Sequence, residues 1–282
     1  MLSTETIQEC IVWACEQEVT APKPGNVNCY GDGHNMKIQD FISSAHAIAP
    51  ALSKPGLAIG DMILQAIKAT RTVVNCNTNL GIVLLFAPLC KAIQNCSQFE
   101  QLPSALNSVL QNLTVEDAAA CYQAIRLAEP GGMGTSEQQD INDVPTVTLR
   151  QAMALAEQED TIAAQYLNNY HEILHIGLSN LTSAINCGES VEWASALAYL
   201  KILSSVPDTL ICRKYGLECA REVMENAKQI TCKASETNTL QAVEPFLIAW
   251  DNELKKKEIN PGTTADMTAA TLLVYAFEQA LS

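Results

Sequence analysis

The stretch ATRTVVNCNTNLGIVLLFAPL, Ala69–Leu89, predicts the element around which the rest of the chain folds. A charged residue, Arg71, stands near its start, a polar Asn-Thr-Asn cluster fills its middle, and an uncharged apolar run, Ile82–Leu89, ends it. A membrane-spanning helix takes about 20 apolar residues. The run is much shorter, so we expect a helix that is buried in the core of the protein.

The start of this expected helix is a candidate binding site for an anion. Asn77, Thr78 and Asn79 precede the apolar run, and such side chains commonly cap a helix by accepting from its free backbone N–H groups. The N–H groups that stay free and the helix dipole attract negative charge. A helix start that faces a phosphate and an ordinary capped core helix both agree with these residues, and the stretch alone leaves both open.

Composition predicts a helical protein. Hydrophobic residues make up 48% of the 282 residues, and Ala, Leu and Ile dominate over Val, Phe and Tyr, which favours helices over strands. Few segments alternate with period two, so the expected fold class is all-α. The length suits one large domain or two small ones. Because no linker rich in Gly, Ser or Pro divides the chain, we expect a single globular multi-helix domain over residues 1–282.

Charge and cysteine content narrow the class of partner. A formal net charge of -14 repels a phosphate backbone and argues against nucleic acid, but local cations, helix ends or a bound metal can still hold a small anion. The eleven cysteines form no C-x-x-C pair and indicate reduced thiols in a cytoplasmic protein. The first residues lack the basic region of a signal peptide, and we expect no membrane partner.

Two loops have features that favour a ligand. In VTAPKPGNVNCYGDG, Val19–Gly33, two prolines hold the backbone extended around Lys23, as a clamp for an anion would. In EPGGMGTSEQQDINDVPT, Glu129–Thr146, clustered glycines would let the backbone approach a phosphate. The second loop matches neither G-x-G-x-x-G nor the P-loop. Turns without any ligand would explain both loops equally well.

A long helix is expected over Thr148–Leu174. Thr148 and Gln151 form a capping box at its start, in which each side chain bonds the backbone of the other. Asp160 lies on its otherwise apolar stripe. A carboxylate in that position must be paired, neutralised or bound to a metal, so Asp160 belongs either to a buried structural pair or to a site.

Two further helix starts carry aspartates. Asp208 follows Pro207 and can cap a short helix over residues 209–215, with Arg213 and Lys214 in the last turn. The two cations there would complement the helix dipole even without a ligand. In NPGTTADM, Thr263 can cap the last helix and Asp266 would lie in its first turn, where a negative charge is favoured.

The segment His171-Glu172-Ile173-Leu174-His175 matches the H-E-x-x-H pattern of zinc peptidases. On a helix this pattern puts two imidazoles on one face, with the Glu as base for a metal-bound water. The longer metzincin form needs a Gly three residues later, but Leu178 stands there, and no later histidine exists as a third ligand. The match is also explained as a coincidence on an amphipathic helix.

Taken together, the segments of the chain identify a family. The chain resembles the triphosphoribosyl-dephospho-CoA synthases, which make the prosthetic-group precursor of citrate lyase and malonate decarboxylase. The matching segments occur in the family's order and span most of the chain: PKPGNV (22–27), DFISSAHAIAP (40–50), GDMILQAIKATR (60–71), NTNLGIVLLFAPL (77–89), PGGMG (130–134), TLRQAM (148–153), DTLICRKYG (208–216) and NPGTTADMTAA (260–270).

The resemblance implies an all-helical enzyme and a transfer of the glycosyl type. The ribose 2′-hydroxyl of 3′-dephospho-CoA attacks C1 of the ribose of ATP, adenine leaves, and the triphosphate stays on the transferred ribose. A polyphosphate needs cations and helix starts, and Mg²⁺ held by one or two carboxylates suits it. The developing positive charge on the ribose needs a nearby carboxylate, and a base would accept the proton of the attacking hydroxyl.

The resemblance also assigns roles to the residues in these segments. Three cations would hold phosphates: Lys23, Arg213 and Lys214. Asn77, Thr78 and Asn79 would present a helix start to the phosphates. Gly131, Gly132 and Gly134 would let the backbone approach the phosphates closely. Four carboxylates would share metal binding and acid–base work without a division of roles: Asp143, Asp160, Asp208 and Asp266. Asp208 and Asp266 are the expected Mg²⁺ ligands.

One departure from the family pattern leaves alternatives open. Citrate-lyase types carry Gly-x-His-x-Asp-Met, whereas this chain reads Gly33-His34-Asn35-Met36 and lacks the Asp, which puts the loop's role in selecting dephospho-CoA in question. A related transferase for another cofactor, of the methanopterin type, is the first alternative. A zinc peptidase and a non-catalytic nucleotide-binding protein are the others. A homodimer of this chain is a further expectation.

Overall fold

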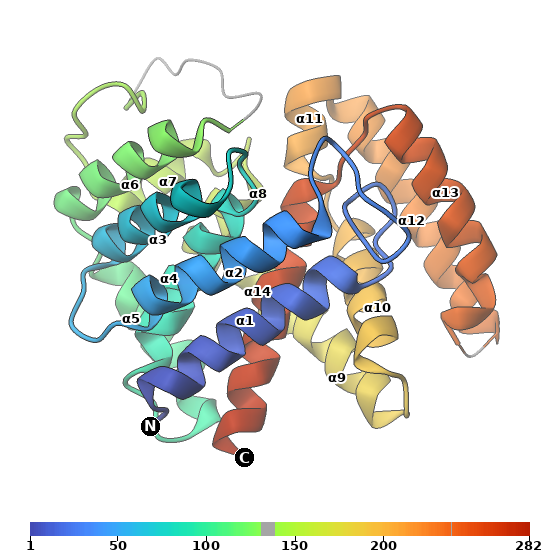
Figure 1. Cartoon of the computed structure of the whole chain (residues 1–282), viewed down its shortest axis with the longest axis horizontal. Coiled ribbons are helices and arrows are strands. Elements are labelled where there is room, and N and C mark those ends of the chain that lie inside the picture. The colour runs from blue at the N-terminus through green and yellow to red at the C-terminus, as the bar shows by residue number, and fades with distance from the viewer. Residues whose placement is uncertain (131–138, 238) are drawn as a thin grey trace.

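The computed structural model describes residues 1–130, 139–237 and 239–282, and it confirms the all-α fold. In these residues there is no strand, and pairing outside the helices is limited to two isolated bridges in the loop before the second helix. The helices (Figure 1) are, in chain order, α1 (Thr4–Thr20), α2 (Ile38–Ser53), α3 (Ile59–Val73), α4 (Leu80–Ile93), α5 (Leu102–Gln111), α6 (Val115–Ala128), α7 (Leu149–Ala156), α8 (Thr161–Asn168), α9 (Leu178–Asn186), α10 (Val191–Leu203), α11 (Thr209–Tyr215), α12 (Leu217–Thr237), α13 (Glu244–Lys256) and α14 (Gly262–Leu281).

The helix that the opening stretch predicts is α4, and it lies in the centre of the molecule. Its residues from Leu80 to Cys90 are all buried. It begins two residues earlier than the apolar run and continues through Pro88 without ending there. Because it is apolar on every side, it needs neighbours all round, and α2, α3, α5, α8 and α14 supply them.

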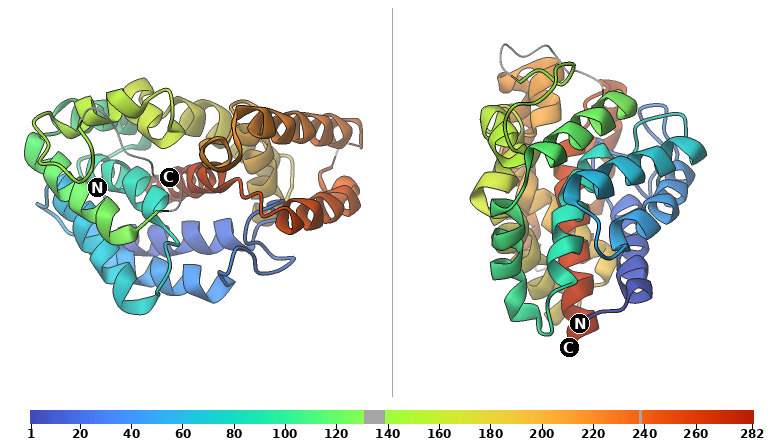
Figure 2. Two further views of the ribbon diagram at one scale, coloured as in Figure 1. Left: turned by 90° about the horizontal axis from the view of Figure 1, so that it is seen from above. Right: turned by 90° about the vertical axis from the view of Figure 1, so that its left-hand side faces the viewer.

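The helices are arranged in layers around α4 and α14. Seen from above (Figure 2, left), α14 runs through the middle, α1 and α2 cover one side, and α8 and α12 lie on the other. In the covering layer, α1 packs on α2, α2 on α3, and α3 on α6. The start of α14 is therefore enclosed between segments that are far apart in the sequence.

The buried apolar side chains form two clusters. The larger one includes residues of α1–α9 and α14, and the smaller one includes residues of α10–α13. One face of α10 belongs to each cluster, with Ala198 in the larger and Tyr199 in the smaller. A single domain stays a prediction. No described helix combines the length and the hydropathy that crossing a bilayer requires.

The expected helix over Thr148–Leu174 is wrong, because the structure divides it. α7 ends at Ala156, and Asp160 then caps α8 by accepting from the backbone N–H of Ile162 at 2.8 Å. A side chain that bonds its own backbone in this way competes with helix continuation. Asp160 thus lies at a helix start and not on a continuous apolar stripe. The capping box of Thr148 with Gln151 is confirmed.

A π-helical turn, η2 (Glu172–Gly177), follows α8 and contains most of the H-E-x-x-H segment. It approaches α14 so closely that a Cβ on Gly177 would lie 2.2 Å from Thr271 Oγ1. The remaining short turns are 3₁₀-helical: η1 (Phe99–Gln101) and η3 (Gln241–Val243).

The predicted cap of the last helix is also wrong. α14 begins at Gly262 after Pro261, so Thr263 lies inside its first turn. The Thr263 hydroxyl instead accepts from the backbone N–H of Leu210 and is bonded to Thr209 Oγ1, each at 3.2 Å. This contact joins the starts of α11 and α14. The predicted cap of α11, Asp208, is confirmed, and Gly216 is the residue at which that helix ends.

Candidate functional site

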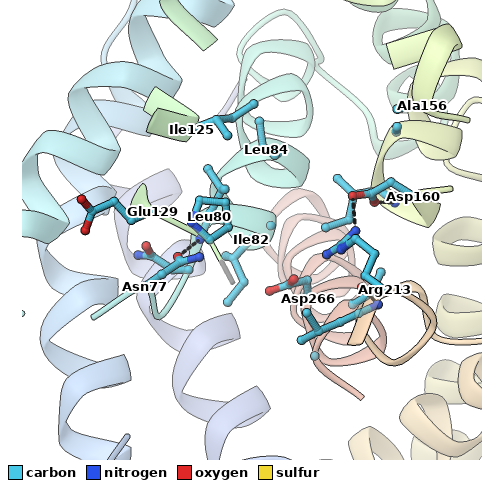
Figure 3. Close-up of a pocket in the computed structure, with 18 of the residues that line it drawn as sticks. Asn77, Leu80, Ile82, Leu84, Ile125, Glu129, Ala156, Asp160, Arg213 and Asp266 are labelled. Carbon is cyan, nitrogen blue, oxygen red and sulfur yellow. Dashed lines mark hydrogen bonds and ion pairs between the residues drawn. The ribbon is translucent and has the colours of Figure 1, made fainter. Parts of the chain in front are cut away.

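A cavity of about 630 Å³ opens where α4, α8 and α14 begin. Its size lies within the range of roughly 300–1,000 Å³ of small-molecule sites. One end is polar and is lined by residues of these helix starts and of α11. The other end is apolar, and α4, α6, α7 and α8 supply its walls. Figure 3 shows side chains from both ends facing the same space.

The start of α4 forms part of the polar end. The N-cap position is Asn79, whose side chain makes no capping bond, and the side chain of Asn77 accepts instead from the backbone N–H of Leu80 at 3.1 Å. Gly81 and Ile82 also line the cavity, and their N–H groups have no acceptor among the described residues. This open helix start suits an anion, because free N–H groups and the helix dipole act in the same direction.

Thr78 and Asn79 line the same wall, but neither side chain makes a capping bond to the helix. The Thr78 hydroxyl is bonded to Ser44 Oγ of α2 at 2.7 Å, and Asn79 Nδ2 donates to Thr70 Oγ1 of α3 at 3.0 Å. Both side chains therefore fix the turn before α4 to the covering layer. The sequence placed all three polar residues at one site, and the structure brings them together there.

Asp266 enters the cavity from the first turn of α14. It faces the start of α4 so closely that a Cβ on Gly81 would lie 2.1 Å from Asp266 Oδ2. Among the described residues, no donor reaches its carboxylate. Burial raises the pKa of Asp266 well above its usual range, Glu18, Asp208 and Asp160 raise it further, and Arg213 opposes them. Arg213 offsets the charge of the ionised form only in part, so a further cation or a donor in the cavity would stabilise it.

Asp160 and Arg213 form an ion pair on the opposite wall, as Figure 3 shows. Arg213 Nη1 lies 2.7 Å from Asp160 Oδ2, while Asp160 Oδ1 caps α8. Arg213 Nε is buried and has no partner. A buried donor without an acceptor calls for an explanation, and a ligand oxygen is one. Lys214, the next residue, is exposed and lines the cavity as well.

Asp208 lies behind the wall and does not line the cavity. Its Oδ1 accepts from the N–H groups of Leu210 and Ile211, and its Oδ2 accepts from the N–H and the hydroxyl of Thr264, all at 2.8–3.1 Å. Burial raises the pKa of Asp208 although these four bonds lower it. The geometry makes Asp208 a joint between α11 and α14, and its predicted catalytic and metal-binding roles stay predictions.

Lys23 is fully buried and lies outside the lining of the cavity. Its ammonium group lies 2.5 Å from Glu18 Oε1, 2.9 Å from Asn26 Oδ1 and 2.8 Å from the carbonyl oxygen of Val27. Its partners Glu18 and Asn26 do line the cavity. Phosphate binding by Lys23 stays a prediction, and the contacts favour an indirect part in the site.

Sequence reasoning missed Glu18, although a signal for it exists. The buried face of α1 repeats at Ile7, Ile11 and Ala14 and then reaches Glu18. A carboxylate in step with an apolar face is a candidate for a buried pair. Burial raises its pKa, and the ion pair with Lys23 opposes that rise.

The apolar end of the cavity had no signal in the sequence. Its walls come from four separate helices, α4, α6, α7 and α8, and are formed by apolar side chains such as Leu80, Leu84, Ile125, Leu149, Met153, Ala156 and Ile162. Figure 3 shows Leu84 and Ile125 above the polar end. Such a slot suits a flat or flexible apolar group next to a charged one.

Other predicted site residues lie elsewhere. Asp143 is exposed, lies outside the cavity lining and turns the loop after Asp140, to whose carbonyl oxygen its N–H donates. Gly131, Gly132 and Gly134 lie outside the described residues. Their roles stay predictions.

The H-E-x-x-H segment lies apart from the cavity. Its two histidines are exposed with ring centroids 4.9 Å apart. The Glu172 carboxylate accepts from Gln165 at 2.6 Å and from Asn168 at 2.8 Å. Within the described ranges, no group of three or more His, Cys, Asp or Glu side chains could hold a metal ion. The geometry therefore gives the zinc peptidase alternative no support.

Comparison with known proteins identifies the family. The model of the ATP:dephospho-CoA triphosphoribosyl transferases matches residues 4–282. Two Vibrio cholerae proteins, from strains M66-2 and El Tor Inaba N16961, carry the name "probable 2-(5''-triphosphoribosyl)-3'-dephosphocoenzyme-A synthase". Each is 24% identical over 92% of this chain and 83% of its own length.

A solved structure has the same fold. It is a crystal structure from Archaeoglobus fulgidus, provisionally named a triphosphoribosyl-dephospho-CoA synthase, with a TM-score of 0.66 and 23% sequence identity over 84% of this chain and 98% of that one. The chain belongs to the ATP:dephospho-CoA triphosphoribosyl transferase family and is a transferase that uses ATP.

Proposed function

We propose that the cavity is where this transferase moves the triphosphoribosyl group of ATP to the ribose 2′-hydroxyl of 3′-dephospho-CoA. The acceptor oxygen forms a bond to C1 of the ATP ribose while the bond from C1 to adenine breaks. The electron pair of the broken bond stays with adenine, which takes up one proton while the acceptor hydroxyl loses one. The single observation that carries the proposal is the meeting of an open helix start, a cationic side chain and an uncompensated carboxylate at one end of the cavity.

The triphosphate would lie at the polar end. The free N–H groups at the start of α4 would bind one phosphate, and Arg213, with its unpaired Nε, would bind another. Arg binds phosphate through several parallel donors. Lys214 would add a mobile cation at the rim. The open helix start and these two cations come from opposite walls, so a chain of phosphates can bridge them.

Mg²⁺ fits the same end. The cavity lining holds more carboxylates than cations: Glu18, Glu129, Asp140, Glu159, Asp160 and Asp266 against Arg213 and Lys214. A bare triphosphate would meet net repulsion there, and a divalent cation removes it. Asp266, which no donor reaches, is the carboxylate available to the metal. One carboxylate together with phosphate oxygens is a common way to hold Mg²⁺.

Adenine would occupy the apolar slot before it leaves. A purine is flat, and the slot beside Leu84, Ile125 and Met153 offers apolar walls next to the polar end. The ribose would then lie between the slot and the start of α4. Asp266, on the wall beside that position, is placed to stabilise positive charge that develops on the ribose.

Release of adenine tests this function. The protein would be incubated with ATP, Mg²⁺ and 3′-dephospho-CoA, and free adenine and the mass of the acceptor product would be measured together. We expect adenine and the triphosphoribosyl adduct in equal amounts, and neither when the acceptor is omitted. Glu225→Gln, a surface carboxylate on α12 far from the cavity lining, is the matched control and should retain full activity. Absence of adenine with a folded protein would contradict the proposal.

The choice of acceptor is tested in the same assay. In a second series, acceptors of the methanopterin type replace dephospho-CoA, which tests whether the enzyme makes another cofactor. The family match does not favour this alternative. A homodimer and a cytoplasmic location stay predictions. Sedimentation of the purified chain would test the first of these.

A further inference from the structure

The ion pair of Lys23 with Glu18 uses the whole ammonium group. Lys23 has three donors, and the structure gives it three acceptors: Glu18, Asn26 and the carbonyl of Val27. The side chain is fully buried, and burial lowers its pKa while Glu18 raises it. For Lys23 to reach a phosphate, this set would have to break, leaving a buried carboxylate uncompensated. Any part of Lys23 in the site is therefore indirect, through the side chains of Glu18 and Asn26 that it binds.

What it holds is one carboxylate oxygen of Glu18. Glu18 lines the cavity although its side chain is only 2% exposed, and Lys23 is the one side-chain donor that the described residues give its carboxylate. A carboxylate has about four acceptor positions, so Lys23 leaves positions on it that a ligand in the cavity can use. Glu18 thus offers an acceptor to whatever fills the cavity.

Two uncharged polar side chains accompany the pair of Glu18 with Lys23 at the cavity. Asn26 Nδ2 donates to Asn260 Oδ1 at 2.7 Å, and both residues line the cavity beside Glu18. The charge of Glu18 itself is balanced by Lys23. A balanced carboxylate attracts a cation less than Asp266 does, because Asp266 has no partner. It remains a strong acceptor for a neutral donor such as a hydroxyl group.

We propose that Glu18 accepts a hydrogen bond from a ribose hydroxyl of the bound ATP, and that Lys23 is a positioning residue that holds Glu18 and Asn26 for it. This inference rests on the proposed function, since it takes the ribose to lie next to the triphosphate end. Glu18 and Asp266 both line the cavity, and the charge of Glu18 raises the pKa of Asp266. The metal ion would bind Asp266, and the ribose hydroxyl would donate to Glu18.

Binding of ATP analogues tests the proposal. Affinities for ATP, 2′-deoxy-ATP and 3′-deoxy-ATP would be measured with Mg²⁺ by calorimetry. A hydrogen bond to a charged group contributes about 1.5–3 kcal/mol, so one deoxy analogue should bind about 10- to 150-fold more weakly than ATP to the wild type. In the double variant Glu18→Gln/Lys23→Met, which removes both charges together, the two nucleotides should bind within about 3-fold of each other.

A second variant guards against loss of the fold. Glu18→Asp keeps the charge of the pair but withdraws the carboxylate by one methylene, and it should lose the same preference for ATP. Glu225→Gln should keep the wild-type preference. Folding of each variant is checked by its thermal transition.

The outcomes separate this inference from the proposed function. Failure of the wild type to bind ATP would overturn both. Equal affinity of the wild type for ATP and both deoxy analogues would overturn the role of Glu18 and leave the reaction intact. A preference for ATP that survives in the folded Glu18 variants would also overturn it, as would a loss confined to binding of the acceptor nucleotide.

Discussion

Asp266 and Asp208 lie at the starts of two adjoining helices, and their carboxylates have opposite surroundings. Asp208 receives four hydrogen bonds, two of them from Thr264 in the first turn of α14. Asp266, two residues farther along that turn, receives none and opens to the cavity. The hydrogen bonds of Asp208 stabilise the fold, whereas the carboxylate of Asp266 is available to a ligand.

The same distinction separates the cavity wall from the layer behind it. Away from the cavity, Asp117 accepts from the backbone N–H groups of Gly60 and Thr114, and Asp251 accepts from Gly25 and Asn28. These carboxylates join loops to helices. Uncompensated groups at a site store unfavourable energy that a ligand relieves, so variants of the two classes should differ in sign as well as in size.

The largest expected effect is that of Asp266→Asn on turnover. Loss of the metal ligand and of the charge beside the ribose should lower adenine release by at least about 100-fold, the scale on which one preorganised electrostatic group acts. The variant should melt at a higher temperature than the wild type at pH 7, because it removes an uncompensated charge. Wild-type turnover, or a lower melting temperature, would contradict the interpretation.

The dependence of this stability difference on pH has a defined sign. The pKa of Asp266 in the folded state is raised, chiefly by burial. Its contribution to stability is therefore complete below the ordinary pKa of Asp and is lost as pH rises through the folded-state value. Melting curves of the wild type and of Asp266→Asn should converge near pH 4 and separate toward pH 8. Curves that separate at low pH instead would show the opposite linkage.

Gly81→Ala should have the next largest effect. The added Cβ would lie 2.1 Å from Asp266 Oδ2 and 2.6 Å from Ile162 Cδ1, so Asp266 must move. A displacement of about 1 Å at a reacting group can cost about 100-fold in rate, and crowding of a packed site costs about 1–3 kcal/mol. Steady-state rates and urea unfolding would measure the two parts. A fully active, equally stable variant would place Asp266 outside the reaction.

Asp208→Asn should change stability more than chemistry. The amide can still accept at one atom, but its NH₂ group meets the donors of Thr264 where an oxygen stood. We expect a loss of about 1–3 kcal/mol in the free energy of unfolding and a smaller loss of turnover than in Asp266→Asn. If the folded variant is instead dead and equally stable, the catalytic role predicted from the sequence is right and the structural one is wrong.

The smallest effect is expected from His171→Ala. The histidine is exposed and lies apart from the cavity, so turnover should stay within about 2-fold of the wild type, as surface substitutions away from a site usually do. Metal analysis of the purified chain accompanies the assay. Stoichiometric zinc together with an inactive variant would restore the peptidase alternative.

Local rules made much of this architecture predictable. The uncharged run before Leu89 indicated a buried central helix, and Asp208 followed by a short apolar segment indicated a capped helix; the structure has both. The family segments also brought Arg213, Asp266 and the Asn-Thr-Asn cluster to one cavity. The two helices depend on residues close in sequence, where capping and periodicity act, whereas the meeting of the distant residues was expected only from the family resemblance.

The rest depended on contacts between distant segments. Asp160 lies on a helical stripe in the sequence, but it pairs with Arg213, 53 positions away, and it accepts from the backbone N–H of Ile162, where a new helix starts. Thr263 looked like a cap and is used by α11 instead. Lys23 was predicted to clamp an anion, because its ion-pair partner Glu18 belongs to another element and the loop sequence does not reveal the pair. Contacts between distant segments determine the roles of such residues, and the local sequence pattern does not reveal these contacts.

Binding of ATP with and without Mg²⁺, to the wild type and to Asp266→Asn, tests the central claim most directly. If Asp266 is the carboxylate left for the metal, Mg²⁺ should strengthen ATP binding to the wild type by tens of fold and to the variant only slightly. Without Mg²⁺ the variant should bind ATP more tightly than the wild type, because one repelling charge is gone. Equal enhancement by Mg²⁺ in both proteins would contradict the account.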